Sequence, residues 1–225
     1  MDTTQIQIAI DGPSGAGKSS AAKILSKKLG ILYLNTGAMY RAFTYHALKN
    51  GKYKPLGQND TDELFAAFDL NFDGDNVFLN GEDISDVIRT VEIDKKVSDY
   101  ASDPYVRKKM VALQKQIAQG RGIVMEGRDI CSVVLPDAPY KFYIDASVDV
   151  RAKRRYDEDL KKGLNVSYEE IRNDIIRRDE VDSGREADPL KISQDAVFID
   201  SSEYTLDGVT DMIINIIKTK EKNYV

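Results

Sequence analysis

Residues 12–19 read Gly-Pro-Ser-Gly-Ala-Gly-Lys-Ser and match the pattern G-x-x-x-x-G-K-[ST] of a phosphate-binding loop. Glycines at this spacing let backbone N–H groups turn inward around phosphate oxygens. The preceding residues, QIQIAID at 5–11, alternate like a strand, and an apolar-periodic helix follows to about Leu29. Because a helix N-terminus attracts anions, the whole segment predicts a nucleoside triphosphate site.

The residue types in the loop predict how that site works. We expect the Lys18 ammonium to reach the β- and γ-phosphates and the Ser19 hydroxyl to ligate Mg²⁺. The predicted ATP-binding residues are Gly12, Pro13, Ser14, Gly15, Ala16, Gly17, Lys18, Ser19 and Ser20. Switches, motors, helicases and kinases share such a loop, so the rest of the chain must decide between them.

Composition limits the class of protein. The chain has 225 residues, 42% hydrophobic and 31% charged, which fits a single soluble domain over residues 1–225. It has no apolar run long enough for a membrane span, no signal-like N-terminus and one cysteine, Cys131, so we expect a cytoplasmic protein. A net charge of -5 argues against a nucleic-acid partner. The one histidine, His46, lies mid-helix and is expected to be structural.

Away from the loop, strand patterns alternate with helical patterns. This order predicts an α/β fold, with a mostly parallel sheet covered by helices on both faces. The further strands are expected at 32–34, 122–126, 140–145 and 196–200. Helix caps are expected at Thr36, at Asp60 with Glu63, at Ser147, and at Ser167 with Glu170. Residues 69–84 alternate around Asp-Gly and Asn-Gly turns and predict a small antiparallel sheet, within an inserted subdomain at about 62–97.

Two features favour a small-molecule kinase. Arg151, Arg154 and Arg155 share one helix face, and RRDEVDSGREADP at 177–189 is polar and rich in charge, as in a mobile lid over about 155–188. The alternative is a solvated helix face with ion pairs. The chain has no [NT]-K-x-D segment of the kind that guanine-specific switches carry.

The segment Glu126-Gly-Arg-Asp129 follows a predicted strand directly. Ligands lie at the carboxyl ends of strands in open parallel sheets, so Arg128 is placed to hold a phosphate. A carboxylate there would face the acceptor or the water shell of the metal. The alternative is a turn with an internal ion pair.

Taken together, these segments resemble bacterial cytidylate kinases over nearly the whole chain. The matching stretches are IAIDGPSGAGKSS (8–20), LNTGAMYRA (34–42), VMEGRDI (124–130), VVLPDAPYKFYIDAS (133–147), RAKRRY (151–156) and RRDEVDSGREADPL (177–190). The resemblance implies a core with a five-stranded parallel sheet, an acceptor-binding region with a small inserted sheet, and an arginine lid. It also implies a monomeric kinase that transfers the γ-phosphoryl group of ATP·Mg²⁺ to CMP or dCMP.

The resemblance further implies which residues meet the acceptor. Those around the cytosine would be Thr36, Arg107, Asp129 and Arg185; those near the sugar would be Ser98, Arg178 and Asp182; those on the acceptor phosphate would be Arg41 and Arg128. A carboxylate such as Asp129 would accept from the N4 amine of cytosine and oppose the O4 of uracil.

Two positions depart from the family pattern. Ser19-Ser20 replaces the family's frequent Gly-[TS], which still fits the general loop. Cys131-Ser132 replaces Gly-Thr after EGRDI, so Cys131 would be strained if the backbone there required a positive φ. Otherwise Cys131 is expected to be a small buried apolar residue.

The predicted chemistry is positioning plus charge neutralisation, since the acceptor phosphate is already ionised at neutral pH. The predicted catalytic residues are Lys18, Arg128, Arg154, Arg155 and Arg178. Either Asp11 or Glu126 is expected to orient waters of the Mg²⁺. Three alternatives stay open: another acceptor such as UMP, dTMP or an alcohol; a regulatory NTP-binding switch; and an RNA-binding module using the arginines.

Overall fold

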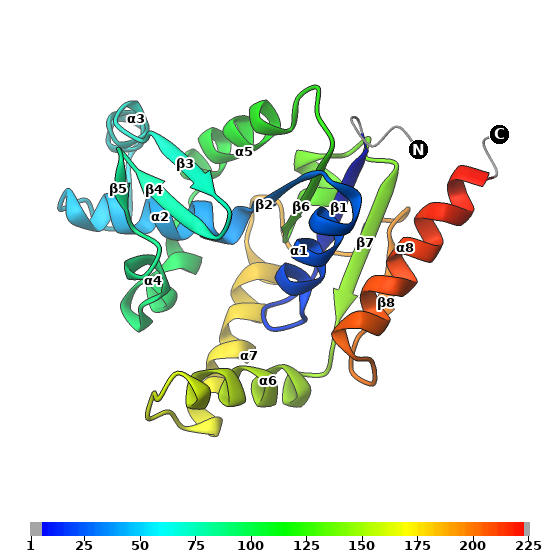
Figure 1. The fold of residues 1–225 in the computed structure, drawn as a ribbon. Helices are drawn as coiled ribbons and strands as arrows, with labels where there is room; N and C mark the ends of the chain where they lie inside the picture. Colours follow the sequence, from blue (N-terminus) through cyan, green and yellow to red (C-terminus); the bar gives the residue numbers. More distant parts are fainter. Residues whose placement is uncertain (1–5, 223–225) are drawn as a thin grey trace. The chain divides into compact units, whose positions relative to one another are not determined.

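A computed structural model describes residues 6–222, and the chain divides into two compact units (Figure 1). The first comprises the residues up to 34, residues 118–184 and those from 188 onward. The second comprises residues 35–117 and 185–187.

A five-stranded sheet with the order β2-β6-β1-β7-β8 organises the first unit. β1 pairs in parallel with β6 and with β7, and β7 pairs in parallel with β8. Asp11 at the end of β1 is in register with Gly127, the last residue of β6, and with Tyr143 of β7, which continues to Asp145. The α/β prediction is confirmed. The strands are β1 (Gln7–Asp11), β2 (Leu32–Asn35), β6 (Ile123–Gly127), β7 (Tyr140–Asp145) and β8 (Val197–Asp200).

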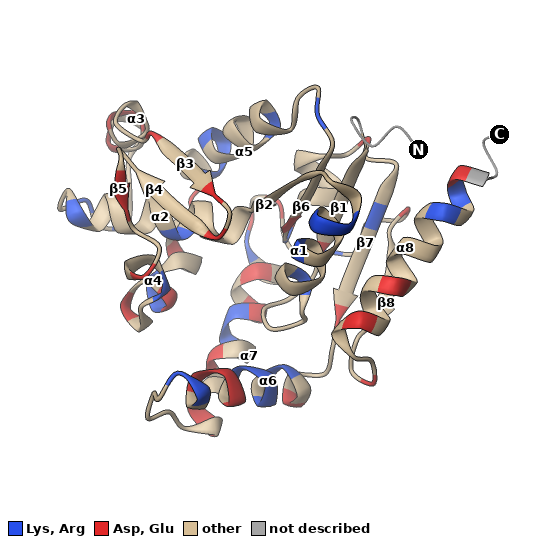
Figure 2. Ribbon diagram, in the orientation of Figure 1, with Lys and Arg blue, Asp and Glu red and all other residues tan. Residues whose placement is uncertain are grey.

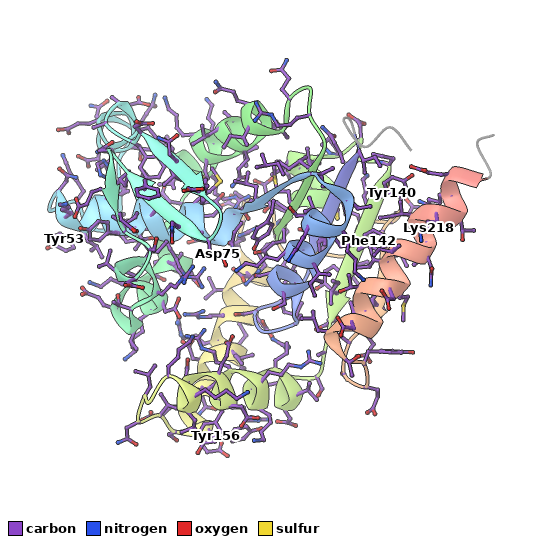
Figure 3. The ribbon with its side chains drawn as sticks, in the orientation of Figure 1. Tyr53, Asp75, Tyr140, Phe142, Tyr156 and Lys218 are labelled. Carbon is purple, nitrogen blue, oxygen red and sulfur yellow. The ribbon has the colours of Figure 1, made fainter. Side chains whose placement is uncertain are left out.

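Helices α1 and α8 pack on one face of this sheet and form its main core. Ile8 and Ile10 of β1 contact a cluster that includes Leu25 of α1 and Ile213 of α8. Phe142 of β7 belongs to the same cluster and is 1% exposed (Figure 3). The helices of this unit are α1 (Lys18–Leu29), α6 (Val148–Lys161), α7 (Tyr168–Gly184) and α8 (Leu206–Lys222).

Several predicted element ends in the first unit are confirmed. Gly30, with φ of 66°, ends α1 in a left-handed conformation. Ser147 caps α6 by accepting from the Val150 N–H, and Ser167 accepts from the Glu170 N–H before α7. Gln5, the first residue of the strand predicted at 5–11, lies outside the described residues.

The second unit combines four helices with a small antiparallel sheet, as the turn residues predict. β3 pairs with β4 and β4 with β5. Phe43 of α2 stacks on Phe65 and meets Phe68 edge-on. His46 is buried and its Nε2 lies 3.2 Å from the Leu64 carbonyl, in keeping with a structural role. The elements are α2 (Thr36–Lys49), α3 (Gln58–Ala66), β3 (Leu70–Asp73), β4 (Asn76–Leu79), β5 (Glu82–Asp83), a 3₁₀ turn (Val87–Arg89), α4 (Val91–Ala101) and α5 (Pro104–Ala118).

Two predicted helix caps in this unit are wrong. Asn35, not Thr36, caps α2, because its side-chain oxygen accepts from the Ala38 N–H at 2.8 Å. α3 begins at Gln58, so Asp60 is already inside its first turn and cannot be its cap. Asp60 pairs with Lys52 instead.

Residues 177–184 of the predicted lid are helical and form the end of α7. Buried side chains on this helix include Ile175, Arg178 and Asp182. The bounds 62–97 and 155–188 for the inserted subdomain and the lid stay predictions. Within residues 6–222, no helix combines the length and the apolar character that crossing a bilayer requires.

Candidate active site

The phosphate-binding loop joins β1 to α1 through glycine conformations that other residues avoid. Gly12 has a φ of 146°, and a Cβ there would lie 1.9 Å from the Ile144 carbonyl oxygen of β7. Gly15 and Gly17 have φ of 79° and 92°. The Gly12 position therefore excludes any side chain, and the chain turns tightly over the end of the sheet.

Lys18 is the first residue of α1 and its side chain folds back into the loop. It is 5% exposed, and its Nζ donates to the Pro13 carbonyl at 2.6 Å. Burial, together with the nearby Arg128 cation, lowers the pKa of Lys18 from 10.5 to about 7. An ammonium group with a carbonyl as its partner would gain strongly from an incoming phosphate, and the phosphate-binding role of Lys18 stays a prediction.

Ser19 and Glu126 form a hydroxyl–carboxylate pair beside the loop that could hold a magnesium ion. The Ser19 hydroxyl donates to Glu126 Oε1 at 2.8 Å, and the Tyr33 hydroxyl donates to the same oxygen at 3.3 Å. Mg²⁺ bound with nucleotide phosphates usually takes one or two protein ligands and keeps several waters. The described residues contain no cluster of three His, Cys, Asp or Glu side chains that could hold a metal ion.

Asp11 has different partners from Glu126. Its two carboxylate oxygens accept from the backbone N–H groups of Ile130 and Cys131, each at 2.8 Å. Burial is the largest cause that raises its pKa, to about 6. Its carboxylate is thus engaged with the chain segment that follows Arg128 and Asp129.

That segment, Ile130–Val134, is a π-helix, where the sequence left the structure uncertain. Cys131 is buried at 2% exposure, and it is not among the described residues with positive φ. The strain considered for Cys131 is therefore absent, and the prediction of a small buried residue is confirmed.

Arg128 and Asp129 follow the end of β6 at the strand edge, as predicted. Arg128 Nε donates to Asp182 of α7 at 2.7 Å, and its Nη1 donates to the Gly127 carbonyl at 3.3 Å. Asp129 is 5% exposed. Two predicted acceptor-binding residues, Arg128 and Asp182, are thus brought into direct contact.

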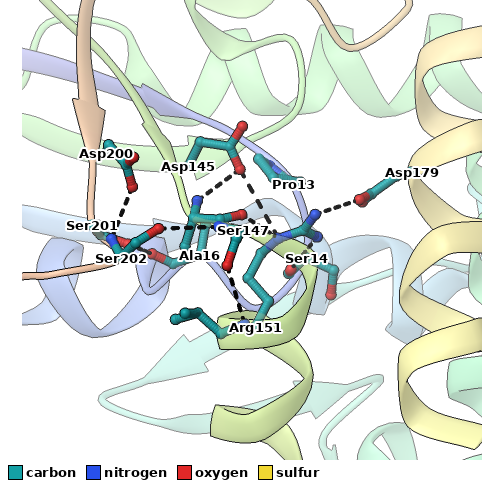
Figure 4. Close-up of polar contacts among 12 residues, drawn as sticks. Pro13, Ser14, Ala16, Asp145, Ser147, Arg151, Asp179, Asp200, Ser201 and Ser202 are labelled. Atoms are coloured by element: carbon teal, nitrogen blue, oxygen red, sulfur yellow. Dashed lines mark hydrogen bonds and ion pairs between the residues drawn. The ribbon is translucent and has the colours of Figure 1, made fainter. Parts of the chain in front are cut away.

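Arg151 of α6 links the phosphate loop to helix α7. The sequence did not predict this role. It is 4% exposed and donates to the carbonyls of Ala146 and Ser14 at 2.8 and 3.0 Å. Its Nη2 donates to Asp179 of α7 at 2.6 Å (Figure 4). Helical spacing grouped it with Arg154 and Arg155, but no local signal could identify the distant Ser14 and Asp179 as partners.

Arg154 is linked to the phosphate loop by Ser201, which follows β8. Its Nη1 and Nη2 donate to the Ser201 hydroxyl and carbonyl at 3.1 and 2.6 Å. The Ser201 hydroxyl in turn donates to the Ala16 carbonyl of the loop at 3.1 Å. Ser201 is a second loop-supporting residue that sequence reasoning missed.

The remaining predicted cations of this unit pair with aspartates on their own helices. Arg155 Nε lies 3.0 Å from Asp159, and Arg178 Nε lies 2.9 Å from Asp174. Basic and acidic residues alternate along α6 and α7 (Figure 2). These contacts are ion pairs within single helices, and the lid stays a prediction.

The other predicted acceptor-binding residues belong to the second unit. Arg41 Nε donates to Asp94 at 2.9 Å. Arg107 is 2% exposed and donates to the Ala101 carbonyl at 3.2 Å and the Tyr40 hydroxyl at 3.4 Å. The unit also holds Thr36, Ser98 and Arg185.

A glycine loop at the carboxyl ends of the strands, a buried lysine and a hydroxyl–carboxylate pair define a nucleotide-binding protein of the phosphate-binding-loop class. The family described as "Cytidylate kinase" matches residues 8–219, so the chain belongs to the cytidylate kinase family. It is 48% identical to "Cytidylate kinase" of Clostridium botulinum (strain Langeland / NCTC 10281 / Type F), over 95% of this chain and 98% of that one. It is 44% identical to "Cytidylate kinase" of Caldanaerobacter subterraneus subsp. tengcongensis, over the whole of both chains.

A solved structure shares the fold at lower identity. The crystal structure of an uncharacterized protein from Eubacterium ventriosum ATCC 27560 matches with a TM-score of 0.52 and 19% identity, over 96% of this chain and 99% of that one.

Proposed function

We propose that this chain transfers the γ-phosphoryl group of ATP to CMP or dCMP, giving CDP or dCDP and ADP. The observation that carries the proposal is the pairing of a complete phosphate loop with family membership over residues 8–219. The loop accounts for the donor, and the family accounts for the acceptor.

Lys18 supplies the positive charge at the transferring group. Its Nζ exchanges the Pro13 carbonyl for β- and γ-phosphate oxygens when ATP binds. Because the phosphates restore a full ion pair, the lysine returns to its charged form and stays charged through transfer.

The metal is Mg²⁺, held by the Ser19 hydroxyl, with Glu126 orienting its waters. When bound, this ion would supply positive charge to neutralise the charge that develops on the nucleotide phosphates. Glu126 is favoured over Asp11 because Glu126 already contacts Ser19, whereas the Asp11 oxygens accept from backbone N–H groups.

Arg128 holds the acceptor phosphate after leaving Asp182. The acceptor's dianion is a stronger partner for a guanidinium than a single carboxylate oxygen, since it can bind bidentately. Asp182 is then released to the acceptor sugar. Arg41 makes the corresponding exchange from Asp94 in the second unit.

Arg154, Arg155 and Arg178 are proposed to stabilise the charge of the transferring group. Each must give up or share its present partner for this, respectively Ser201, Asp159 and Asp174. The assignment of Thr36, Ser98, Arg107, Asp129 and Arg185 to the cytidine part of the acceptor likewise rests on the family.

A panel of acceptors tests the proposal. ADP formation from ATP·Mg²⁺ is measured with CMP, dCMP, UMP, AMP, GMP and dTMP offered separately. Strong turnover with CMP and dCMP alone is expected. Turnover with a different acceptor alone would retain the kinase and contradict the cytosine assignment, and acceptor-independent ADP formation would favour an NTP-hydrolysing switch.

A further inference from the structure

Asp11 is a buried carboxylate that the proposed chemistry does not use. It is the last residue of β1, directly before Gly12, and it is 1% exposed. A buried carboxylate is costly unless its oxygens are hydrogen-bonded. Its two partners therefore indicate why the chain keeps a charge at this position.

Those partners are the first two N–H groups of the π-helix Ile130–Val134. A helix start leaves such N–H groups without partners inside the helix. The local capping position, Asp129, makes no side-chain capping bond. Asp11 supplies the cap instead, from 119 and 120 residues away in the sequence.

The capped turn starts directly after Arg128 and Asp129. Gly127 on their N-terminal side is held by its register with Asp11 in the sheet, and Ile130 on their C-terminal side is held by the Asp11 carboxylate. The Cys131 thiol adds long contacts to the carbonyls of Ala9 and Phe142, at 3.6 and 3.7 Å. One aspartate thus fixes both ends of the Arg-Asp dipeptide.

We propose that Asp11 is a positioning residue for the acceptor, which fixes the backbone of Arg128 and Asp129 and takes no part in orienting the metal. The inference rests on the proposed function, since it uses the acceptor roles assigned to those two residues. It predicts that disturbing Asp11 impairs the acceptor side of the reaction and spares the donor side.

The test compares two isosteric substitutions, Asp11→Asn and Glu126→Gln. In Asp11→Asn one oxygen still accepts, but the new amide N–H₂ opposes the second backbone N–H. The matched control is Asp211→Asn, since Asp211 is an exposed partner of Lys28 on α8. For each protein, KM for CMP, the CMP-to-UMP preference, the half-activating Mg²⁺ concentration and the Kd of Mg·ATP without acceptor are measured.

Asp11→Asn is expected to lower kcat/KM for CMP by about 10- to 100-fold, the range for a lost bond to a charged group, and to lower the CMP-to-UMP preference. Its Mg²⁺ requirement and Kd for Mg·ATP should stay within about threefold of wild type, the spread usual for a contact that is not disturbed. Glu126→Gln should instead raise the Mg²⁺ requirement and leave the constants for CMP near those of wild type. Asp211→Asn should match wild type in every measurement.

The inference is overturned if Asp11→Asn raises the Mg²⁺ requirement as Glu126→Gln does, or if it leaves the acceptor constants unchanged. If Asp11→Asn does not fold, the Ile130 backbone amide is replaced by an ester instead. This change removes one N–H partner of Asp11 while keeping the carboxylates of Asp11 and Glu126, and the same two outcomes would overturn the inference. If wild-type protein itself shows no CMP-dependent turnover, the proposed function fails instead, so the two failures are distinguishable.

Discussion

The phosphate loop and the arginine-bearing helices α6 and α7 both carry cations for the same reaction, yet their charges are held differently. The Lys18 ammonium donates to a neutral carbonyl, Pro13, in a buried site. By contrast, arginines of α6 and α7 pair with aspartates: Arg151 with Asp179, and Arg178 with Asp174. The loop is ready for an anion, whereas Arg155 and Arg178 must exchange carboxylates that they already hold.

The two kinds of cation therefore differ in how much binding free energy they offer an incoming phosphate. A phosphate that enters the loop meets a desolvated donor, Lys18, whose hydrogen-bond partner is a carbonyl and not a carboxylate. A phosphate that meets Arg155 or Arg178 must displace a carboxylate, so the net gain there is smaller. Substitutions in the loop should therefore cost more than substitutions of the helix arginines.

The largest effect is expected for Lys18→Met. Loss of the one loop ammonium should lower kcat/KM by about 10²–10³-fold, the range for removing one preorganised donor. Steady-state ADP formation with CMP measures it. Lys28→Met, on the exposed side of α1, is the matched control and should behave as wild type. A kcat/KM for Lys18→Met within a few-fold of wild type would contradict the role of Lys18 in phosphoryl transfer.

Gly12→Ala tests the backbone half of the loop. A Cβ there meets the Ile144 carbonyl at 1.9 Å in a backbone conformation that alanine avoids, so unfolding free energy should fall by about 3 kcal/mol or more. Gly51→Ala is the control, because Gly51 also has positive φ, 67°, but open space around it. It should cost about 1 kcal/mol. Equal losses in chemical denaturation would contradict the tight approach to β7.

Arg151→Lys tests whether an ion-paired arginine of α6 supports the loop. Lysine cannot reproduce the fork that joins Ser14, Ala146 and Asp179, so KM for ATP should rise by about 10-fold. Arg172→Lys alters a more exposed pair with Asp149 and should change KM for ATP by less than about twofold. Similar values for the two variants would show that Arg151 does not position the loop.

The smallest predicted effect is the uptake of a proton by Lys18 when ATP binds. Because the pKa of Lys18 is lowered to about 7, most of the lysine is neutral at pH 8 before ATP binds. Phosphates raise that pKa, so ATP binding at pH 8 should take up about one proton, and less as the pH falls below 7. Calorimetry in buffers of different ionisation enthalpy measures the uptake. Its persistence in Lys18→Met would assign the proton to another group.

The same comparison explains what could be predicted from the sequence. The loop is a local motif, since glycine positions and the following helix are set by neighbouring residues, and the parallel sheet follows from alternating strand and helix patterns. The roles of Arg151 and Asp11 depend on partners more than a hundred residues away in Ser14 and Ile130. The Asp60 cap failed because α3 begins two residues earlier, at Gln58, so that Asp60 lies inside the first turn and pairs with Lys52.

The most direct test of the kinase activity follows the labelled γ-phosphate of ATP to its acceptor. Wild-type protein is incubated with γ-³²P-ATP and Mg²⁺, with and without CMP, and the products are separated. Label is expected in CDP whenever CMP is present, with little label in inorganic phosphate. Label that appears only in inorganic phosphate, at a rate that CMP does not change, would contradict the kinase assignment.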